Sequence, residues 1–219
     1  MQKRYFIVFG PPGSGKGTQV KVLAERLGLP AISTGDLLRS EIEKGTPIGL
    51  SVKSLLAKGK LASDEVVGEL LLKRLRRRDT AAGVIFDGYP RRLSQQEFLL
   101  GHLAAKRPEP LITPLLIDVS DEEVVRRISG RRACLCGAVY HITSKPPKED
   151  GKCDRCGGKL FIRDDDKPSV VKARLKTYHK ESAKILDYWH KQGNLIEING
   201  EQTIEKVDAE LMRKLKKHI

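Results

Sequence analysis

Long hydrophobic runs are absent from this sequence of 219 residues: no apolar stretch approaches the ~20 residues that a helix needs to cross a bilayer. Aromatic residues are also scarce, at 5% of the chain, and they do not alternate with basic residues as single-strand nucleic-acid-binding proteins usually require. A net charge of +13 suits phosphate-bearing partners without choosing among them. We therefore expect no membrane span and no specific nucleic-acid partner.

Cysteine occurs only four times, and all four residues lie between positions 134 and 156. The short apolar run before the first glycines has the wrong length and flanks for a signal peptide, so we expect a cytoplasmic protein. Reducing conditions there disfavour structural disulfides and make metal binding the favoured use of clustered thiols. Nothing in the sequence demands more than a monomer.

The most informative motif is G-P-P-G-S-G-K-G-T at residues 10–18, directly after an apolar run at 5–9. Closely spaced glycines let the backbone turn sharply and point several N–H groups into one concavity. A helix that begins near Gly15 adds its positive dipole end, and Lys16 adds a full charge where the β- and γ-phosphates of a nucleotide would lie. In contrast to the usual G-x-x-x-x-G-K-[ST] motif, Gly17 follows the lysine and the hydroxyl group comes at Thr18. The alternative is a glycine-rich turn without a ligand.

The rest of the chain alternates short β-like runs with amphipathic helical stretches, as in a parallel sheet covered on both faces. Ser94 and Ser120 each precede a glutamate by three residues, which is the spacing of a helix capping box. Thr46-Pro47 and Pro168 are typical helix starts. The expected strands are residues 5–9, 31–32, 84–86, 115–119 and 195–198.

Several further segments occur in a characteristic order: I-S-T-G-D-L-L-R at 32–39, D-G-Y-P-R at 87–91, G-R-R at 130–132, V-Y-H at 139–141 and R-D-D-D at 163–166. Together with the phosphate loop they closely resemble the adenylate kinase family in its long-lid, zinc-bearing form. The resemblance covers nearly the whole chain. It implies a five-stranded P-loop α/β core (1–32, 63–129 and 167–219), a helical NMP-binding insertion (33–62) and a small zinc-bearing lid (130–166).

The same resemblance implies Mg²⁺-dependent, reversible transfer of the γ-phosphoryl group of ATP to AMP, giving two ADP. The implied ATP-binding residues are Gly13, Ser14, Gly15, Lys16, Gly17, Thr18, Arg131, Val139, Tyr140 and Gln202. The implied AMP-binding residues are Thr34, Arg39, Lys60, Leu61, Ala62, Gly88, Tyr89, Pro90, Arg91, Gln95, Arg163 and Arg174. The implied catalytic residues are Lys16, Asp87, Arg91, Arg127, Arg131, Arg163 and Arg174.

Two of these assignments also follow from chemistry. Asp87 ends an apolar strand, where an open α/β sheet places its ligands, and a carboxylate there can hold the water shell of Mg²⁺. The alternative is a capped turn that needs no ion. Arginine suits bidentate contacts with phosphate oxygens, which supports Arg39 and Arg91 as phosphate ligands.

The four cysteines form a C-x-C…C-x-x-C set: Cys134, Cys136, Cys153 and Cys156. The second pair, followed by two glycines, has the form of a zinc knuckle, whereas the first is one residue shorter than the usual C-x-x-C. We expect four thiolates on one structural Zn²⁺. His141 is a possible substitute ligand, and metal-free thiols or a disulfide are the alternatives.

Two other functions remain open at this point. One is a kinase for another nucleoside monophosphate or for a small hydroxyl acceptor. The other is a basic zinc-ribbon protein that binds nucleic acid and carries an ATP-binding core.

Overall fold

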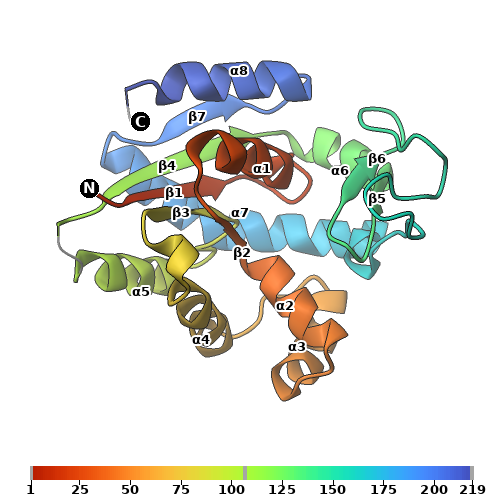
Figure 1. The fold of residues 1–219 in the computed structure, drawn as a ribbon, viewed down its shortest axis with the longest axis horizontal. Helices are drawn as coiled ribbons and strands as arrows, with labels where there is room; N and C mark the ends of the chain where they lie inside the picture. The colour runs from red at the N-terminus through yellow and green to blue at the C-terminus, as the bar shows by residue number, and fades with distance from the viewer. Residues whose placement is uncertain (1, 106–107, 218–219) are drawn as a thin grey trace.

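The computed structural model describes residues 2–105 and 108–217, and its centre is a parallel five-stranded sheet in the order β2-β3-β1-β4-β7 (Figure 1). The predicted α/β class and the five-stranded sheet are therefore confirmed. The strands of this sheet are β1 (Arg4–Phe9), β2 (Ala31–Ser33), β3 (Gly83–Asp87), β4 (Leu111–Asp118) and β7 (Ile196–Asn199).

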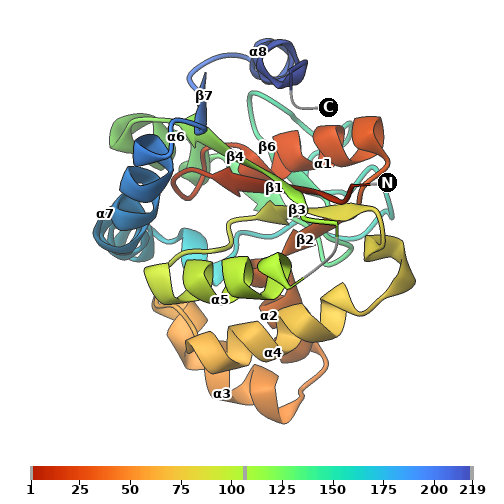
Figure 2. The same cartoon turned by 90° about the vertical axis from the view of Figure 1, so that its left-hand side faces the viewer.

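Helices cover both faces of the sheet, and the side chains of β1 alternate between the two resulting cores. Tyr5, Ile7 and Phe9 join the core on the side of α4 and α5, whereas Phe6 and Val8 join the core on the side of α1 and α8 (Figure 2). The helices are α1 (Lys16–Leu27), α2 (Thr34–Glu43), α3 (Pro47–Ala57), α4 (Asp64–Leu75), α5 (Leu93–Ala104), α6 (Asp121–Ser129), α7 (Pro168–Lys191) and α8 (Ile204–Leu215), with short 3-10 turns η1 (Arg78–Thr80) and η2 (Asp164–Asp166).

Helix α7 is the longest of these, at 24 residues, and it packs along the edge of the whole core. Val171 and Leu175 near its start belong to one core, and Ile185 and Trp189 near its end belong to the other. Within the described part of the chain, no helix combines the length and the apolar character that a membrane crossing requires.

Most of the predicted helix starts are confirmed. The Thr46 hydroxyl accepts the Gly49 N–H at 3.1 Å with Pro47 as the first helical residue, and Ser120 caps α6. The capping box predicted at Ser94 is wrong. Helix α5 begins at Leu93, two residues before the start that a cap at Ser94 implies, and the Ser94 hydroxyl donates to the carboxylate of Asp64 instead.

Strand β4 is longer than predicted, because it begins at Leu111 rather than at 115. This added part of the strand contains Pro114, a residue type that sheets generally confine to their edges. In the structure, β7 pairs with β4 only from Leu115 onward, so Pro114 lies where that side of β4 is still a sheet edge. A missing N–H is tolerated at such an edge.

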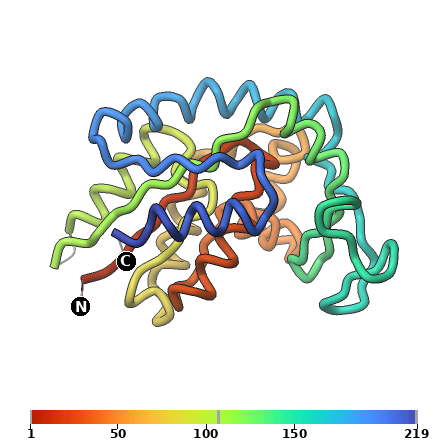
Figure 3. The backbone as a smooth tube through the Cα atoms, turned by 90° about the horizontal axis from the view of Figure 1, so that it is seen from above, coloured from red at the N-terminus to blue at the C-terminus, as the bar shows by residue number. Residues whose placement is uncertain are grey.

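Two segments extend from the core over the carboxyl ends of the strands. Helices α2 and α3 form the first (residues 33–62), which we name the acceptor arm after the AMP-binding role that the sequence analysis expects for it. Residues 130–166, with the antiparallel pair β5 (Arg131–Ala133) and β6 (Val139–His141), form the second, which we name the flap; it projects at one end of the molecule (Figure 3). Both touch the core. A Cβ on Gly59 of the arm would lie 2.9 Å from Arg174 Cγ, and Lys21 Nζ of α1 donates to the Gly137 carbonyl of the flap at 3.1 Å.

The arm is also tightly packed internally, since a Cβ on Gly49 of α3 would lie 2.1 Å from the Glu41 carbonyl oxygen of α2. We expect Gly49→Ala to lower the free energy of unfolding by about 2 kcal/mol, because the methyl group forces the two helices apart. Gly101→Ala is the matched control: Gly101 is also helical, no atom lies within 4 Å of the place that a Cβ would take there, and alanine should stabilise by up to ~1 kcal/mol. Denaturant unfolding of both variants measures the difference, and equal effects would contradict the packing argument.

Candidate active site

The loop between β1 and α1 is built so that its backbone can approach other segments closely. Gly10, Gly13 and Gly15 all have positive φ values, of 145°, 82° and 89°. A Cβ on Gly10 would lie 2.5 Å from the Ile117 carbonyl oxygen, and one on Gly13 would lie 2.6 Å from the Ile128 side chain. Gly15 is the residue before α1, so the loop ends at a helix N-terminus with free N–H groups.

The side chain of Lys16 folds back over this loop. Its ammonium group donates to the carbonyl oxygens of Gly10 and Pro11 at 2.8 and 2.7 Å, and it approaches the Ser14 hydroxyl at 3.4 Å. Burial lowers the pKa of Lys16 to about 7, an effect that Asp87 opposes and that Arg91 reinforces. The lysine is thus held over the loop in a strongly cationic setting.

Asp87, at the carboxyl end of β3, faces the start of α1. A Cβ on Gly17 would lie 3.3 Å from its Oδ2 atom, so the glycine that replaces the usual hydroxyl residue leaves room for this carboxylate. Burial raises the pKa of Asp87, while the charge of Lys16 opposes the rise. A carboxylate oxygen set beside the loop is a suitable ligand for a hydrated divalent cation.

Two arginines from separate segments share one buried carboxylate. Arg131 of β5 donates from Nε to Asp166 at 2.8 Å, and Arg174 of α7 lies 3.4 Å from the same side chain, which is only 1% exposed. Arg174 also pairs with Asp165 at 2.9 Å. Burial lowers the pKa of Arg174 to about 10, which still leaves it charged at neutral pH.

Three further arginines approach this group from other directions. Arg91 follows β3 and donates from Nε to the Gly88 carbonyl at 2.7 Å, and Arg39 of α2 pairs with Asp36. Arg163 precedes η2, and burial, followed by repulsion from Arg39 and Arg131, lowers its pKa to about 10. Five of the predicted arginines therefore lie close together, although they come from four separate parts of the sequence.

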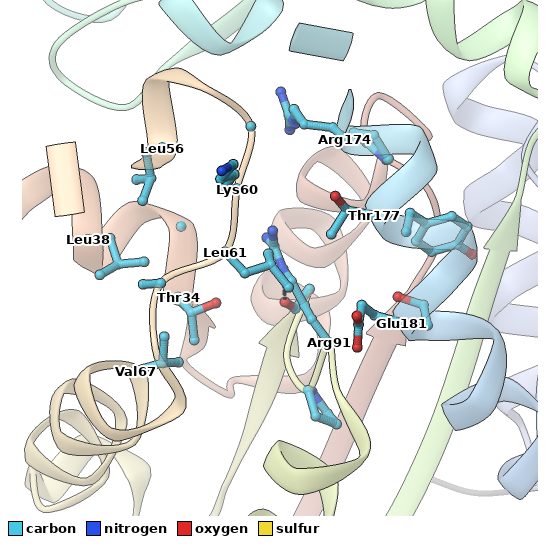
Figure 4. A pocket seen from close by; sticks show the side chains of 18 of the residues that line it. Thr34, Leu38, Leu56, Lys60, Leu61, Val67, Arg91, Arg174, Thr177 and Glu181 are labelled. Atoms are coloured by element: carbon cyan, nitrogen blue, oxygen red, sulfur yellow. Dashed lines mark hydrogen bonds between the residues drawn. The ribbon is translucent and has the colours of Figure 1, made fainter. Parts of the chain in front are cut away.

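A pocket lies between this cluster, the acceptor arm and α7. Arg91 sits between arm residues such as Thr34 and Leu61 on one side and Thr177 and Glu181 on the other (Figure 4). Eleven of the predicted side chains or backbones line this pocket: Lys16, Thr34, Arg39, Lys60, Leu61, Ala62, Gly88, Pro90, Arg91, Gln95 and Arg174.

The sequence interpretation missed the wall of this pocket that α7 supplies. Thr177 and Glu181 line the pocket, and they follow Arg174 at i+3 and i+7. That spacing places all three on one helix face. Once Arg174 was assigned to the site, this helical spacing could have identified Thr177 and Glu181 from the sequence. The apolar residues Leu38, Leu56 and Val67 were missed as well, and they line the arm side.

Thirteen of the predicted nucleotide-binding and catalytic residues do not line this pocket, and four of them make contacts that bear on their assigned roles. Tyr89 is buried, and its hydroxyl donates to the Gln95 carbonyl at 3.3 Å, so only its backbone is near the site. Tyr140 is buried in the flap, where its hydroxyl accepts the N–H of Asp154 at 2.8 Å. Arg127 and Gln202 lie on the other side of the phosphate loop. Arg127 contacts the Ser14 carbonyl at 3.3 Å and the Gly200 carbonyl at 2.8 Å, and Gln202 donates to Glu210 at 2.7 Å.

The four cysteines of the flap form a candidate metal centre. Their sulfur atoms all lie within 4.8 Å of one another, with the Cys134–Cys156 and Cys136–Cys153 pairs at 3.5 and 3.6 Å. Four thiolates around one Zn²⁺, with bonds of about 2.3 Å, would stand about 3.8 Å apart, so the set fits this ion. His141 is engaged elsewhere: its Nδ1 accepts the N–H groups of Thr143 and Ser144 at 3.1 and 3.2 Å.

Comparison with known proteins adds independent information. A family model described as adenylate kinase matches residues 8–194. The chain is 46% identical to an adenylate kinase of Methanosarcina barkeri, over 96% of this chain and 98% of that protein. It is 44% identical to adenylate kinases of Methanocella arvoryzae and Archaeoglobus fulgidus, over 97% and 96% of this chain and 98% and 97% of theirs.

The lowered pKa of Lys16 yields a prediction about protons. A polyphosphate that binds beside Lys16 raises its pKa, so binding should take up a proton wherever the free lysine is neutral and the bound one is charged. Uptake should be small at pH 6 and approach about one proton at pH 8–9. Titration calorimetry of ATP binding in buffers of different ionisation enthalpy measures this number. Lys16→Met should abolish the uptake, and a wild-type value that does not change with pH would contradict the prediction.

Proposed function

The chain belongs to the adenylate kinase family, and on this premise we propose how its residues divide the work of the reaction. The protein catalyses reversible transfer of the γ-phosphoryl group of ATP to AMP, which gives two ADP. It requires Mg²⁺ with ATP, as the family implies. Another nucleoside monophosphate acceptor and a nucleic-acid-binding ATPase are not favoured, because the relatives over nearly the full chain are adenylate kinases.

On the donor side, we assign the triphosphate of ATP to the loop at residues 10–18. The N–H groups at the start of α1 and the ammonium group of Lys16 supply positive charge there. Asp87 would hold the water shell of the magnesium ion that accompanies ATP. When bound, that ion would neutralise charge on the phosphate oxygens. Val139, Tyr140 and Gln202 remain proposed ATP-binding residues, and Arg127 remains a proposed catalytic residue.

On the acceptor side, Arg39 and Arg91 would hold the phosphate of AMP, and the pocket between the arm and α7 would hold its nucleoside. The attacking atom is a phosphate oxygen, whose second pKa of about 6 leaves it largely ionised at neutral pH. No general base is therefore needed. The residues act by positioning the two phosphates in line and by neutralising their repulsion.

Around the transferred group, Arg131, Arg163 and Arg174 would stabilise the charge that spreads over its oxygens. Asp166 orients two of these guanidinium groups in advance, because it accepts from Arg131 and Arg174 together. An oriented cation loses less entropy when the phosphoryl group arrives. In this proposal Asp166 is a positioning residue rather than a catalytic one.

The arm and the flap would close the site against water, which would otherwise compete as the acceptor. This division treats residues 1–32, 63–129 and 167–219 as the core, 33–62 as the acceptor arm and 130–166 as the flap. A structural Zn²⁺ on the four cysteines would hold the flap as one rigid unit, since a closed four-ligand shell leaves no open position for chemistry. A cytoplasmic, monomeric enzyme without a nucleic-acid partner is part of the same proposal.

The observation that carries the proposal is the convergence of Lys16 of the phosphate loop with Arg39, Arg91 and Arg174, from three other sequence segments, on one pocket, with Arg131 close enough to Lys16 to lower its pKa. A coupled assay for ADP from ATP and AMP tests the activity. A bisubstrate mimic that joins two adenosines through five phosphates should inhibit it tightly, because it fills both halves of the site. A protein without ADP formation and without affinity for this mimic would refute the proposal.

We expect Lys16→Met and Arg131→Met each to lower kcat/KM by about 10³-fold, because each removes a charge used in the transition state. Gln95→Ala should raise the KM for AMP with a much smaller effect on kcat. Arg132→Met is the matched control, since Arg132 donates only to the backbone oxygens of Ser129 and Arg131 at 3.3 and 2.8 Å. Steady-state kinetics decide the matter, and a loss with Arg132→Met equal to that with Arg131→Met would contradict the assignment.

Metal analysis of the purified protein should give about one zinc ion per chain. Removal with a chelator should make the flap the first site of proteolytic cleavage, while the core keeps its helical signal, because the flap has only a small apolar core of its own. Cys156→Ser should reproduce this pattern without chelator. A zinc-free protein with a protease-resistant flap would argue against the metal centre.

A further inference from the structure

Gln95 is buried at 4% exposure and lines the acceptor pocket, and its amide group has two fixed neighbours. Its Oε1 atom accepts the backbone N–H of Arg91 at 2.8 Å, and its Nε2 atom donates to Asp64 Oδ1 at 2.9 Å. An amide offers two N–H donors and two lone pairs on oxygen. These contacts use one of each, which leaves one donor and one acceptor for a ligand.

A glutamine side chain whose amide can rotate freely does not distinguish adenine from hypoxanthine or guanine. The edge of adenine presents an N6–H donor and the N1 acceptor, whereas hypoxanthine and guanine present the O6 acceptor and an N1–H donor. An amide that rotates by 180° about its last bond exchanges its oxygen and nitrogen, so it pairs equally well with either edge. A glutamine therefore distinguishes these bases only when something else fixes which end carries the oxygen.

In this structure a carboxylate and a backbone N–H group fix the orientation of the Gln95 amide. Asp64 can only accept and the N–H of Arg91 can only donate, so the rotated amide would face both with the wrong atom. Although burial opposes the shift, hydrogen bonds from Ser94 and Arg92 help to lower the pKa of Asp64, which keeps it ionised at neutral pH.

Asp64 is itself held in place. Arg92 donates to its Oδ1 at 2.8 Å and the Ser94 hydroxyl donates to its Oδ2, while the same arginine contacts the Ala62 carbonyl at 3.2 Å. The carboxylate thus joins the start of α4, the start of α5 and the end of the acceptor arm. This explains why Ser94 does not cap its own helix.

We propose that Asp64 is a specificity-determining residue of the acceptor site: by fixing the orientation of the Gln95 amide, it selects adenine over hypoxanthine and guanine. Asp64 has no assigned contact with the base, so it is a positioning residue. The inference rests on the proposed function, and it assigns the free donor and acceptor of the Gln95 amide to the base edge of AMP.

The test compares AMP with IMP, because the two acceptors differ only at the edge that the amide would read. In Asp64→Asn the new amide can offer either an N–H or an oxygen, so it no longer opposes rotation of Gln95. We expect the ratio of kcat/KM for AMP to that for IMP to fall about tenfold, which corresponds to the loss of one fixed hydrogen bond to a charged group. The KM for ATP should not change.

Asp64→Ser is a second variant, since serine suits a helix start and its hydroxyl also both donates and accepts. Ser94→Ala is the matched control: it removes a hydrogen bond to the other oxygen of Asp64 but leaves the bond to Gln95, so the ratio should stay at the wild-type value. In a Gln95→Ala background, Asp64→Asn should leave the ratio unchanged, because the amide that it orients is gone.

The results distinguish the role of Asp64 from the contact between Gln95 and the base. A wild-type ratio in both Asp64 variants, together with a reduced ratio in Gln95→Ala, would overturn the role of Asp64 and leave the base contact intact. An unchanged KM for AMP and an unchanged ratio in Gln95→Ala would overturn the base contact itself. Equal loss of activity towards AMP and IMP in the Asp64 variants would indicate a purely structural role and would also overturn the inference.

Discussion

The site depends on holding several cations together in a confined space. Lys16 and five arginines would repel one another, and the structure limits that cost by giving most of them a fixed acceptor. Asp166 and Asp165 hold Arg131 and Arg174, and carbonyl oxygens of the loop hold Lys16. Burial, reinforced by the repulsion that remains, lowers the pKa values of Lys16 and Arg163 below their usual range. A bound anion reduces this repulsion. The clustered cations therefore favour phosphate binding and are already oriented for it before the phosphate binds.

Much of the fold could be read from the sequence, because its signals were local. The glycine-lysine loop after an apolar run, the Thr46-Pro47 helix start and the short β-like runs each needed only a few neighbouring residues. Failures came where a distant segment decided the outcome. The first half of β4 was missed because Pro114 is acceptable only at an unpaired stretch, which depends on where β7 begins. Ser94 failed as a cap because Asp64, thirty residues earlier, binds its hydroxyl.

For the site as well, local motifs were informative and contacts between distant segments were not predicted. Most of the charged residues that the motifs singled out lie close together, although Arg127 does not. The motifs did not reveal which carboxylate holds which arginine, since Asp164, Asp165 and Asp166 are alike in sequence. Only the packing of η2 against α7 separates them: the Asp166 side chain is almost fully buried, whereas Asp164 is exposed. The α7 wall of the pocket was missed for a different reason, because Thr177 and Glu181 belong to no motif.

Helix α7 has a mechanical consequence for the flap. Its first turns pack in one core, its last turns pack in the other, and its middle lines the pocket, so the helix cannot shift without disturbing all three. Any movement of the flap therefore requires changes of backbone dihedral angles in the two connecting segments, one after Ser129 and one before Pro168. In the proposed closure of the flap, the long helix therefore serves as a fixed support, and the backbone of Arg174 keeps the same place relative to the phosphate loop.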